Sequence, residues 1–328
     1  MFDSGAEPEL RRDIDWRRFV RTVRFHRVQG LVWNSLWSIG GDVPGEVAES
    51  LSADAVAIAA ANLRMAAEAR ELRSEFDRAG LALLFVKGLT LGALAYPNPM
   101  LKMSWDIDLL IAPQELADAA ELLRRRGYRR EIPGASVDLH SWHARHKESV
   151  WSQASGIDIE LHTSLADNAD LIPGIDFRSP RSQVEVAPGI VLPTLAREEL
   201  FAHLCVHGAS SAWFRLKWIS DFAGLVARCS VEEIERLYRR SQELGAARAA
   251  GQALAIANEL FDTPLPNVTM DRATRELAAA ALRQLETCAE PTGQPLGTWR
   301  IHWTQLLLKP GLGFKAGEIV RQARSALQ

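Results

Sequence analysis

The sequence predicts an α+β protein, in which a core of short strands and helices lies between a helical N-terminal arm and a mostly helical C-terminal domain. Two observations predict this class. Short apolar runs with glycine or proline at their ends occur between residues 80 and 193, which is typical of strands. Longer runs with apolar residues at helical spacing fill the chain on both sides. We therefore expect domains at 1–79, 80–193 and 194–328.

The two flanking regions carry helical patterns. Residues 13–37 place apolar side chains at helical spacing, and Gly40-Gly41 ends the pattern. Residues 47–79 are rich in alanine and carry charges four apart, which predicts one long helix or two shorter ones before Gly80. In the C-terminal region we expect helices at 195–210, 213–229, 231–244, 246–261 and 272–288.

The core region alternates between strands and helices. The apolar run LALLFV at 81–86 has the length and composition of a buried strand, and Lys87-Gly88 then opens a helix. Two later strands are joined by Ala154-Ser155-Gly156 as a hairpin. The expected ranges after the first strand are 88–94 (helix), 96–104 (loop), 106–111 (strand), 113–126 (helix), 147–153 (strand) and 157–163 (strand).

Charge and composition exclude several classes of protein. The 38 basic and 41 acidic residues leave a net charge of −3, so duplex nucleic acid and anionic membranes feel no general attraction. No stretch approaches the roughly 20 apolar residues that a membrane span needs. The acidic N-terminus is unlike a signal peptide, and the three cysteines lack metal-ligand spacing. We expect a soluble, cytoplasmic protein with no membrane or duplex nucleic-acid partner.

Two aspartates lie two residues apart in the segment WDIDLLI at 105–111. Alternate side chains of a strand share a face, so Asp106 and Asp108 point the same way, with Cα atoms about 6.5–7 Å apart. Paired carboxylates can hold Mg²⁺, and two metals can stabilise both oxygens of a phosphoryl displacement. A bare pair of this kind is more often a solvated strand face. Here the apolar flank indicates a buried strand, where facing carboxylates are costly without a cation.

A third acidic strand, IDIELH at 157–162, follows the pair. Asp158, Glu160 and His162 share one of its faces, and its apolar residues share the other. In this interpretation Glu160 completes a carboxylate triad as a metal ligand or a general base, and His162 orients the carboxylate or the acceptor. An amphipathic edge strand is the structural alternative.

Lys87-Gly88 joins the first strand to a helix. A glycine at this point lets the backbone approach a phosphate, the helix N-terminus attracts anions, and Lys87 adds a positive charge. The dipeptide is a weak signal alone, and its place before the aspartates gives it weight.

Taken together, these segments resemble one known family. The segments FVKG at 85–88, AYP at 95–97, LK at 101–102 and DIDLLI at 106–111 are followed by IELH at 159–162, HG at 207–208, LKW at 216–218 and Asp221. This combination resembles the bacterial "uncharacterised nucleotidyltransferase" family of the DNA polymerase β-like superfamily, over nearly the whole chain.

The resemblance implies a small mixed β-sheet flanked by helices, a site that depends on Mg²⁺ (or Mn²⁺), and an NTP such as ATP as donor. Asp106, Asp108 and Glu160 would be the metal ligands and the catalytic residues. The other implied contacts of the nucleotide are Lys87, Gly88, Thr90, Lys102, His162, Lys217 and Asp221. The implied reaction transfers a nucleoside monophosphate to a small-molecule, saccharide or peptide acceptor and releases pyrophosphate.

Three positions depart from the family pattern. The usual Gly-Ser is Gly88-Leu89, so Thr90 would have to replace the serine contact to phosphate. An arginine common before the aspartates is Lys102, which keeps the charge and loses the bidentate fork. The usual Lys-His after His-Gly-Ala is Ser210-Ser211. Two alternatives stay open, glycosyl transfer from a nucleotide-sugar at the same metal site and a catalytically reduced nucleotide-binding scaffold.

Two further patterns are interpreted as structural. His140, His143 and His146 are spaced by three, but no helix is expected there, so we assign them to a loop and a strand rather than to a metal site. The arginines at 124–126 and 129–130 are expected at a solvated helix end.

Overall fold

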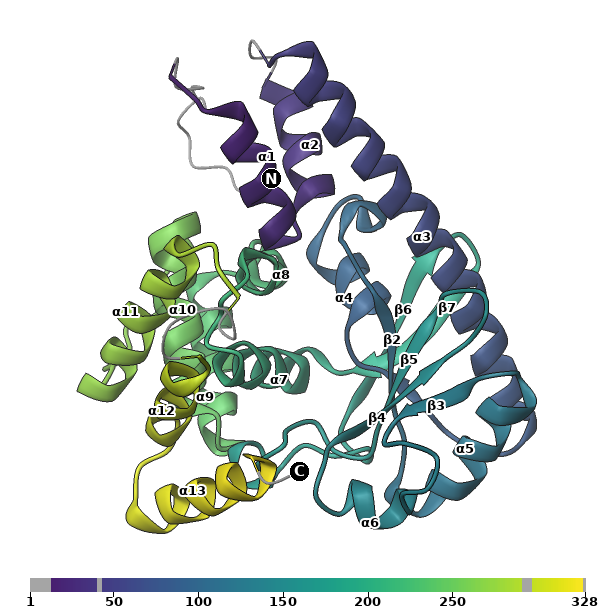
Figure 1. The fold of residues 1–328 in the computed structure, drawn as a ribbon. Helices are drawn as coiled ribbons and strands as arrows, with labels where there is room; N and C mark the ends of the chain where they lie inside the picture. The colour runs from purple at the N-terminus through teal and green to yellow at the C-terminus, as the bar shows by residue number, and fades with distance from the viewer. Residues whose placement is uncertain (1–12, 40–42, 291–296, 327–328) are drawn as a thin grey trace. The chain divides into compact units, whose positions relative to one another are not determined.

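The computed structural model describes residues 13–39, 43–290 and 297–326 (Figure 1). The chain forms two compact units. One contains the described residues up to Ala57 and those from Phe201 onwards, and the other is Ile58–Leu200. The first unit is helical in its described part, and the second holds both β-sheets. The expected α+β class, with a small mixed sheet and a helical C-terminal region, is confirmed.

The first unit is built from short helices and the beginning of one long helix. Its elements are α1 (Trp16–His26), α2 (Gln29–Ile39), the first turns of α3 (Gly45–Arg78), most of α7 (Arg197–Ser210), α8 (Leu216–Val226), α9 (Val231–Glu243), α10 (Ala247–Phe261), α11 (Arg272–Glu286), α12 (Trp299–Leu307) and α13 (Leu312–Ala326). Among the described helices, none is both long and apolar enough to cross a membrane.

Two of the helices expected in this unit are divided or shortened. The pattern at 13–37 forms α1 and α2, because Arg27 has a left-handed φ of 60° and its N–H donates to the carbonyl of Arg24. The helix expected from 213 begins only at Leu216, because Trp213 has a φ of 53°. The predicted break at Gly40-Gly41 lies outside the described residues.

The second unit carries the sheets. Its elements are the rest of α3, β1 (Leu84–Phe85), α4 (Gly88–Ala95), η1 (Pro99–Leu101), β2 (Asp106–Leu110), η2 (Pro113–Glu115), α5 (Leu116–Arg125), β3 (Arg129–Ile132), α6 (Leu139–His143), β4 (Glu148–Ser152), β5 (Asp158–His162), η3 (Ala169–Leu171), β6 (Arg181–Ala187) and β7 (Ile190–Leu195). The region at 47–79 is thus one helix of 34 residues rather than two.

The main sheet has five strands in the order β1-β2-β5-β4-β3. Strands β2 and β5 are parallel neighbours, and the other pairs are antiparallel. The β4–β5 hairpin and the two acidic strands lie where the sequence predicts them. Both acidic strands are apolar on the opposite face because helices cover that side.

The covered face of this sheet forms the core of the unit. Its residues pack against α3 and α5, which run along the sheet in Figure 1. The core includes Ile107, Leu109, Ile159, Leu161 and Trp151 from the strands, Ala66, Ala69, Leu72 and Phe76 from α3, and Leu116, Ala120 and Leu123 from α5. Burial of this face sets the strand registers, because a slip by one residue would bring the acidic side chains into the core.

Several elements of this unit were not expected from the sequence. Arg129 and Arg130 belong to strand β3, so their assignment to a helix end is wrong. His140 and His143 lie on the short helix α6, so their assignment to a loop and a strand is wrong as well. Asp138 accepts a hydrogen bond from the N–H of Ser141 and begins that helix. Strands β6 and β7 were also missed, and they form a separate two-stranded sheet.

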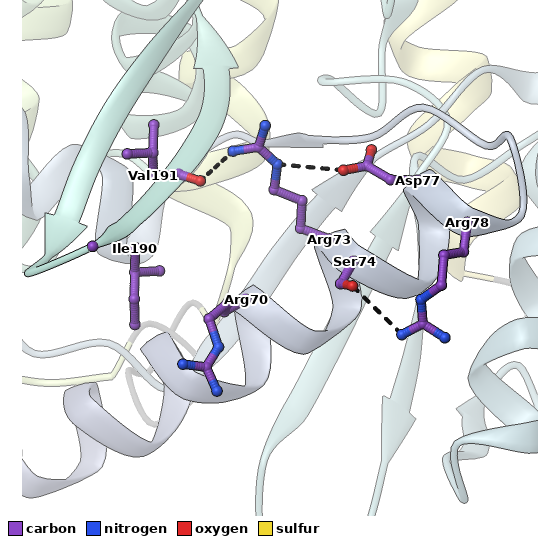
Figure 2. Close-up of a pocket in the computed structure, with 8 residues that line it drawn as sticks. Arg70, Arg73, Ser74, Asp77, Arg78, Ile190 and Val191 are labelled. Carbon is purple, nitrogen blue, oxygen red and sulfur yellow. Dashed lines mark hydrogen bonds and ion pairs between the residues drawn. The ribbon is translucent and has the colours of Figure 1, made fainter.

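Arg73 on α3 holds the β6–β7 hairpin in place. Arg73 donates to Gln183. It also donates to the carbonyl of Val191, and its Nε lies 3.6 Å from Asp77 (Figure 2). Arg70 and Arg78 line the same groove of about 530 Å³, but their guanidinium groups point in different directions. The groove is therefore a packing junction between α3 and the hairpin.

Arg126 at the end of α5 is not part of a solvated helix end. Its guanidinium lies 2.6 Å from carboxylate oxygens of both Glu68 and Glu75 on α3, and the Tyr128 hydroxyl donates to the same Glu68. Only 16% of the Arg126 side chain is exposed, compared with 77% for Arg125. The expected solvated position is wrong for Arg126, because α5 docks on α3 at this point.

Replacement of Arg126 by alanine should lower the free energy of unfolding by about 3 kcal/mol, because it leaves two largely buried carboxylates without their cation. The matched control, Arg125→Ala, removes an exposed pair with Glu121 and should cost less than about 1 kcal/mol. Urea denaturation of both variants measures the difference, and equal losses would show that Arg126 does not join α5 to α3.

Candidate active site

The acidic residues of β2 and β5 meet through the register of the parallel pair. Asp106 lies opposite Asp158, and Asp108 lies opposite Glu160. All four side chains are on the face of the sheet opposite to the apolar core, because residues two apart on a strand share a face. Glu160 therefore lies beside Asp108 as expected, although more than 50 positions separate them in the sequence.

Three side chains on this face come together as a cluster. Donor atoms of Asp108, Glu160 and His162 all lie within 4.8 Å of one another. His162 Nε2 is 3.2 Å from Asp108 Oδ1 and 3.4 Å from Glu160 Oε2. Asp108 and His162 are buried, and Glu160 is 24% exposed. The cluster thus has an inner carboxylate and imidazole and a more accessible outer carboxylate.

Lys87 supplies a positive charge to the same cluster. Its Nζ lies 2.6 Å from Asp108 Oδ1 and 4.0 Å from Glu160 Oε2. Burial alone would lower the pKa of Lys87, but the charges of Asp108, Glu160 and Asp106 outweigh burial and raise it. Burial would likewise raise the pKa of Asp108, but Lys87 and His162 hold it well below its usual range.

This ion pair corrects one expectation from the sequence. Facing carboxylates were expected to repel each other unless a metal was present. The ammonium of Lys87 already compensates Asp108, so the carboxylate is stabilised in its charged form by the chain itself. From the sequence, Lys87 was predicted only as a contact of phosphate. Its pairing with Asp108 was not predictable, because it depends on the antiparallel register of β1 and β2.

Two polar residues near the cluster, Glu148 and His143, were not predicted as part of the site. Glu148 lies opposite His162 in the antiparallel β4–β5 pair, with its Oε2 3.3 Å from His162 Nδ1 and 2.9 Å from Lys147 Nζ. His143 on α6 contacts the hydroxyls of Thr163 and Ser149 at 2.9 and 3.0 Å. Burial alternates along β4, but its sequence ESVWS does not alternate between polar and apolar residues, so no signal in the sequence indicated Glu148.

The two histidines have opposite pKa shifts. Burial and then the nearby charge of His162 lower the pKa of His143 to about 4. Burial would also lower the pKa of His162, but its carboxylate neighbours raise it above its usual value. The carboxylates around His162 therefore favour its charged form in the metal-free protein, whereas burial favours the neutral form of His143.

The turn from β1 into α4 contains the residues expected near phosphate. Gly88 has a φ of 56°, and a Cβ on it would lie 3.5 Å from the carbonyl oxygen of Asp106, so a left-handed residue without a side chain suits the position. Thr90 is fully buried, and its hydroxyl donates to the carbonyls of Phe85 and Lys87 at 3.0 Å. These hydrogen bonds stabilise the turn. The expected contact of Thr90 with phosphate stays a prediction.

The remaining expected contacts are found at separate places. Lys102 is buried, and Asn62 on α3 donates to its carbonyl oxygen at 2.7 Å. Lys217 and Asp221 lie one turn apart on α8 in the helical unit, with Lys217 Nζ 5.9 Å from the ring centre of Trp218. Asp221 is buried. Their contacts with a nucleotide stay predictions.

A comparison of the chain with known protein families gives a match. A family model described as uncharacterised nucleotidyltransferase matches residues 12–262, which include the whole sheet-containing unit. The chain belongs to this family. No curated protein matches the chain.

The donor set of this family member fits a divalent cation. Asp108 and Glu160 offer carboxylate oxygens, and His162 offers a ring nitrogen, all within 4.8 Å of one another. Such oxygen-rich sets suit hard divalent cations. Asp106 extends the same face of β2 towards the solvent, since it is half-buried whereas Asp108 is buried. Lys87 competes with a cation for the Asp108 oxygen, so a bound cation must outweigh that ion pair.

Replacement of Asp108 by asparagine should destabilise the metal-free protein by about 3 kcal/mol, because Lys87 loses its buried partner. Adding Lys87→Met to this variant should recover part of the loss, with a coupling of about 1 kcal/mol or more between the two changes. Denaturation in the presence of a chelator measures the cycle. The control Asp158→Asn lies outside the cluster and should cost less, and strictly additive effects would contradict the pairing.

The lowered pKa of His143 predicts a dependence of stability on pH. Unfolding would return this pKa from about 4 to its ordinary value of 6.5, so the unfolded chain binds more protons between these values. The contribution of His143 is therefore fully present above pH 6.5 and is lost as the pH falls to about 4. Denaturation curves across this range should have a shallower slope for His143→Gln, and a profile parallel to the wild type would disprove the assignment.

Proposed function

We propose that this protein transfers a nucleoside monophosphate from an NTP to an acceptor and releases pyrophosphate. The observation that carries the proposal is the cluster of Asp108, Glu160 and His162 on the acidic face of the β2–β5 pair, in a chain that belongs to a nucleotidyltransferase family. The acceptor is a small molecule, a saccharide or a peptide that offers a hydroxyl, phosphate or amine group.

Three carboxylates are the proposed ligands of a divalent cation, Mg²⁺ or Mn²⁺. These are Asp106, Asp108 and Glu160. When bound there, the cation would supply positive charge at the reacting phosphate and at the leaving pyrophosphate. The low pKa of Asp108 supports its assignment as a permanently charged ligand.

Glu160 is the proposed general base. It is the more accessible member of the cluster, with 24% of its side chain exposed, whereas Asp108 is buried against Lys87. In the proposed step the acceptor oxygen forms a bond to the α-phosphorus while its proton passes to Glu160. The bond between the α-phosphorus and the bridging oxygen breaks, and both of its electrons leave with pyrophosphate.

The β1–α4 turn is the proposed phosphate-binding element. Gly88 leaves the backbone open there, the N-terminus of α4 favours negative charge, and Lys87 adds an ammonium group. Lys102 is the second proposed cation for the triphosphate. Lys217 and Asp221 are proposed contacts of the nucleotide or the acceptor.

Pyrophosphate release with each of the four NTPs and Mg²⁺ or Mn²⁺ tests the proposal. Asp108→Asn and Glu160→Gln should each reduce turnover by a factor of about 100 or more, because each loses a charge used in the transition state. Glu131→Gln, on the exposed part of β3, should leave turnover unchanged. The product mass should increase by a nucleoside monophosphate, and a mass increase of one sugar would instead indicate glycosyl transfer.

Thermal stability separates a catalyst from a binding scaffold. The wild type should gain stability from an NTP with a divalent cation, and Asp108→Asn should lose this gain. A gain without any pyrophosphate release, across a range of acceptors, would favour a nucleotide-binding scaffold. If no NTP changes the melting temperature with either cation, the proposed function is wrong.

A further inference from the structure

Glu148 connects strand β4 to the carboxylate cluster. Because it lies directly opposite His162 in the antiparallel β4–β5 register, its side chain is on the same face of the sheet. Its Oε2 lies 3.3 Å from His162 Nδ1 and 2.9 Å from Lys147 Nζ. The indole N–H of Trp142 donates to the backbone carbonyl of Glu148 at 2.7 Å, which fixes the strand at this residue. The Glu148 carboxylate thus lies between Lys147 and His162, on a strand that Trp142 holds through the backbone.

The imidazole of His162 has a different partner at each ring nitrogen. Nδ1 faces Glu148, and Nε2 faces Asp108 at 3.2 Å and Glu160 at 3.4 Å. The residue is buried, so the ring has little freedom to turn. Nε2 is therefore the ring nitrogen that lies with the carboxylate oxygens of Asp108 and Glu160, all within 4.8 Å of one another. A cation held by these two carboxylates would meet Nε2, while Glu148 lies at the other ring nitrogen.

We infer that His162 Nε2 is a ligand of the cation held by Asp108 and Glu160, that Glu148 is the positioning residue for this ligand, and that the site prefers Mn²⁺ to Mg²⁺. The inference rests on the proposed function, since it concerns the cation of the same site. It goes further because it assigns a nitrogen ligand, a role for Glu148 and a choice of metal.

The chemistry of the donor atoms gives the metal preference. Mg²⁺ demands near-octahedral oxygen coordination and keeps several of its waters, so an imidazole nitrogen adds little to its binding. First-row transition ions accept nitrogen more readily, and their affinity for mixed oxygen and nitrogen sites begins at Mn²⁺ and rises along the series. The addition of one oriented imidazole to the carboxylate ligands therefore favours Mn²⁺ of these two cations.

A purely structural role for Glu148 is the competing explanation. The Lys147 side chain is only 18% exposed, and Glu148 could serve only to neutralise it. That role needs no second contact at His162 Nδ1 and predicts no effect on the choice of metal. The two roles therefore differ in measurements of metal binding, which do not depend on turnover or on an identified acceptor.

Pulsed electron paramagnetic resonance of the full chain with Mn²⁺ is the direct test. A nitrogen ligand gives a hyperfine coupling to ¹⁴N, so the wild type should show this coupling and His162→Gln should not. Mn²⁺ titrations with Mg²⁺ as competitor give the affinity ratio of the two cations. We expect the wild type to favour Mn²⁺ by a factor on the order of ten, and His162→Gln to lose most of that preference.

Variants of Glu148 test the positioning role separately. Glu148→Gln should keep the ¹⁴N coupling but weaken Mn²⁺ binding by about 10-fold, since the neutral amide loses the charged contact at Nδ1 that orients the ring. Glu148→Asp keeps the charge and should recover part of that loss. His143→Gln is the matched control, because it removes a partly buried imidazole whose nitrogens contact Thr163 and Ser149, and it should leave the affinity ratio unchanged.

The outcomes separate this inference from the proposed function. If the wild type binds Mn²⁺ or Mg²⁺ but shows no ¹⁴N coupling, the imidazole is not a ligand, and the proposed nucleotidyl transfer is unaffected. If Glu148→Gln binds Mn²⁺ as tightly as the wild type, Glu148 is only the counter-ion of Lys147. If the wild type binds neither cation with or without an NTP, both proposals fail. Should His162→Gln not fold, the coupling in the wild type still decides the ligand.

Discussion

The parallel pairing of β2 with β5 is the constraint on which the rest of the site depends. Its register places Asp108 directly opposite Glu160, and it does so while burying Ile107, Leu109, Ile159 and Leu161 on the other face. Because side chains alternate along a strand, the apolar residues that hold the sheet against α3 and α5 also determine where the acidic residues point. The fold and the candidate active site are therefore specified by the same two strands.

The buried charges near this strand pair are paired with opposite charges that come from several different elements. Lys87 comes from the end of β1, Asp108 from β2, and Glu160 and His162 from β5, so the charges meet only when the sheet has formed. Each group has a partner of opposite charge at short distance, which offsets the cost of removing it from water. The negative charge of the site is consequently partly neutralised by the chain itself, and its carboxylates can still bind a cation.

The main elements of the site were predictable from the sequence because they have short-range signatures. The alternation in DIDLLI and IDIELH identified both acidic strands, and the Lys87-Gly88 turn marked the start of α4. Strands β3 and β6 were missed because polar residues occupy much of them. Strand β7 is mostly apolar, but Pro193 interrupts its pattern. Helix α6 has only five residues, too few for a periodic pattern.

The sequence by itself determined which strands are acidic, which of their side chains share a face, and the family to which the chain belongs. Only the tertiary structure decided that Lys87 pairs with Asp108, that Glu148 faces His162, and that Arg126 joins α5 to α3. The physical reason is the range of the interactions. The alternation of side chains along a strand is local, whereas an ion pair between residues far apart in sequence depends on strand order, register and helix docking, which follow from packing of the whole unit.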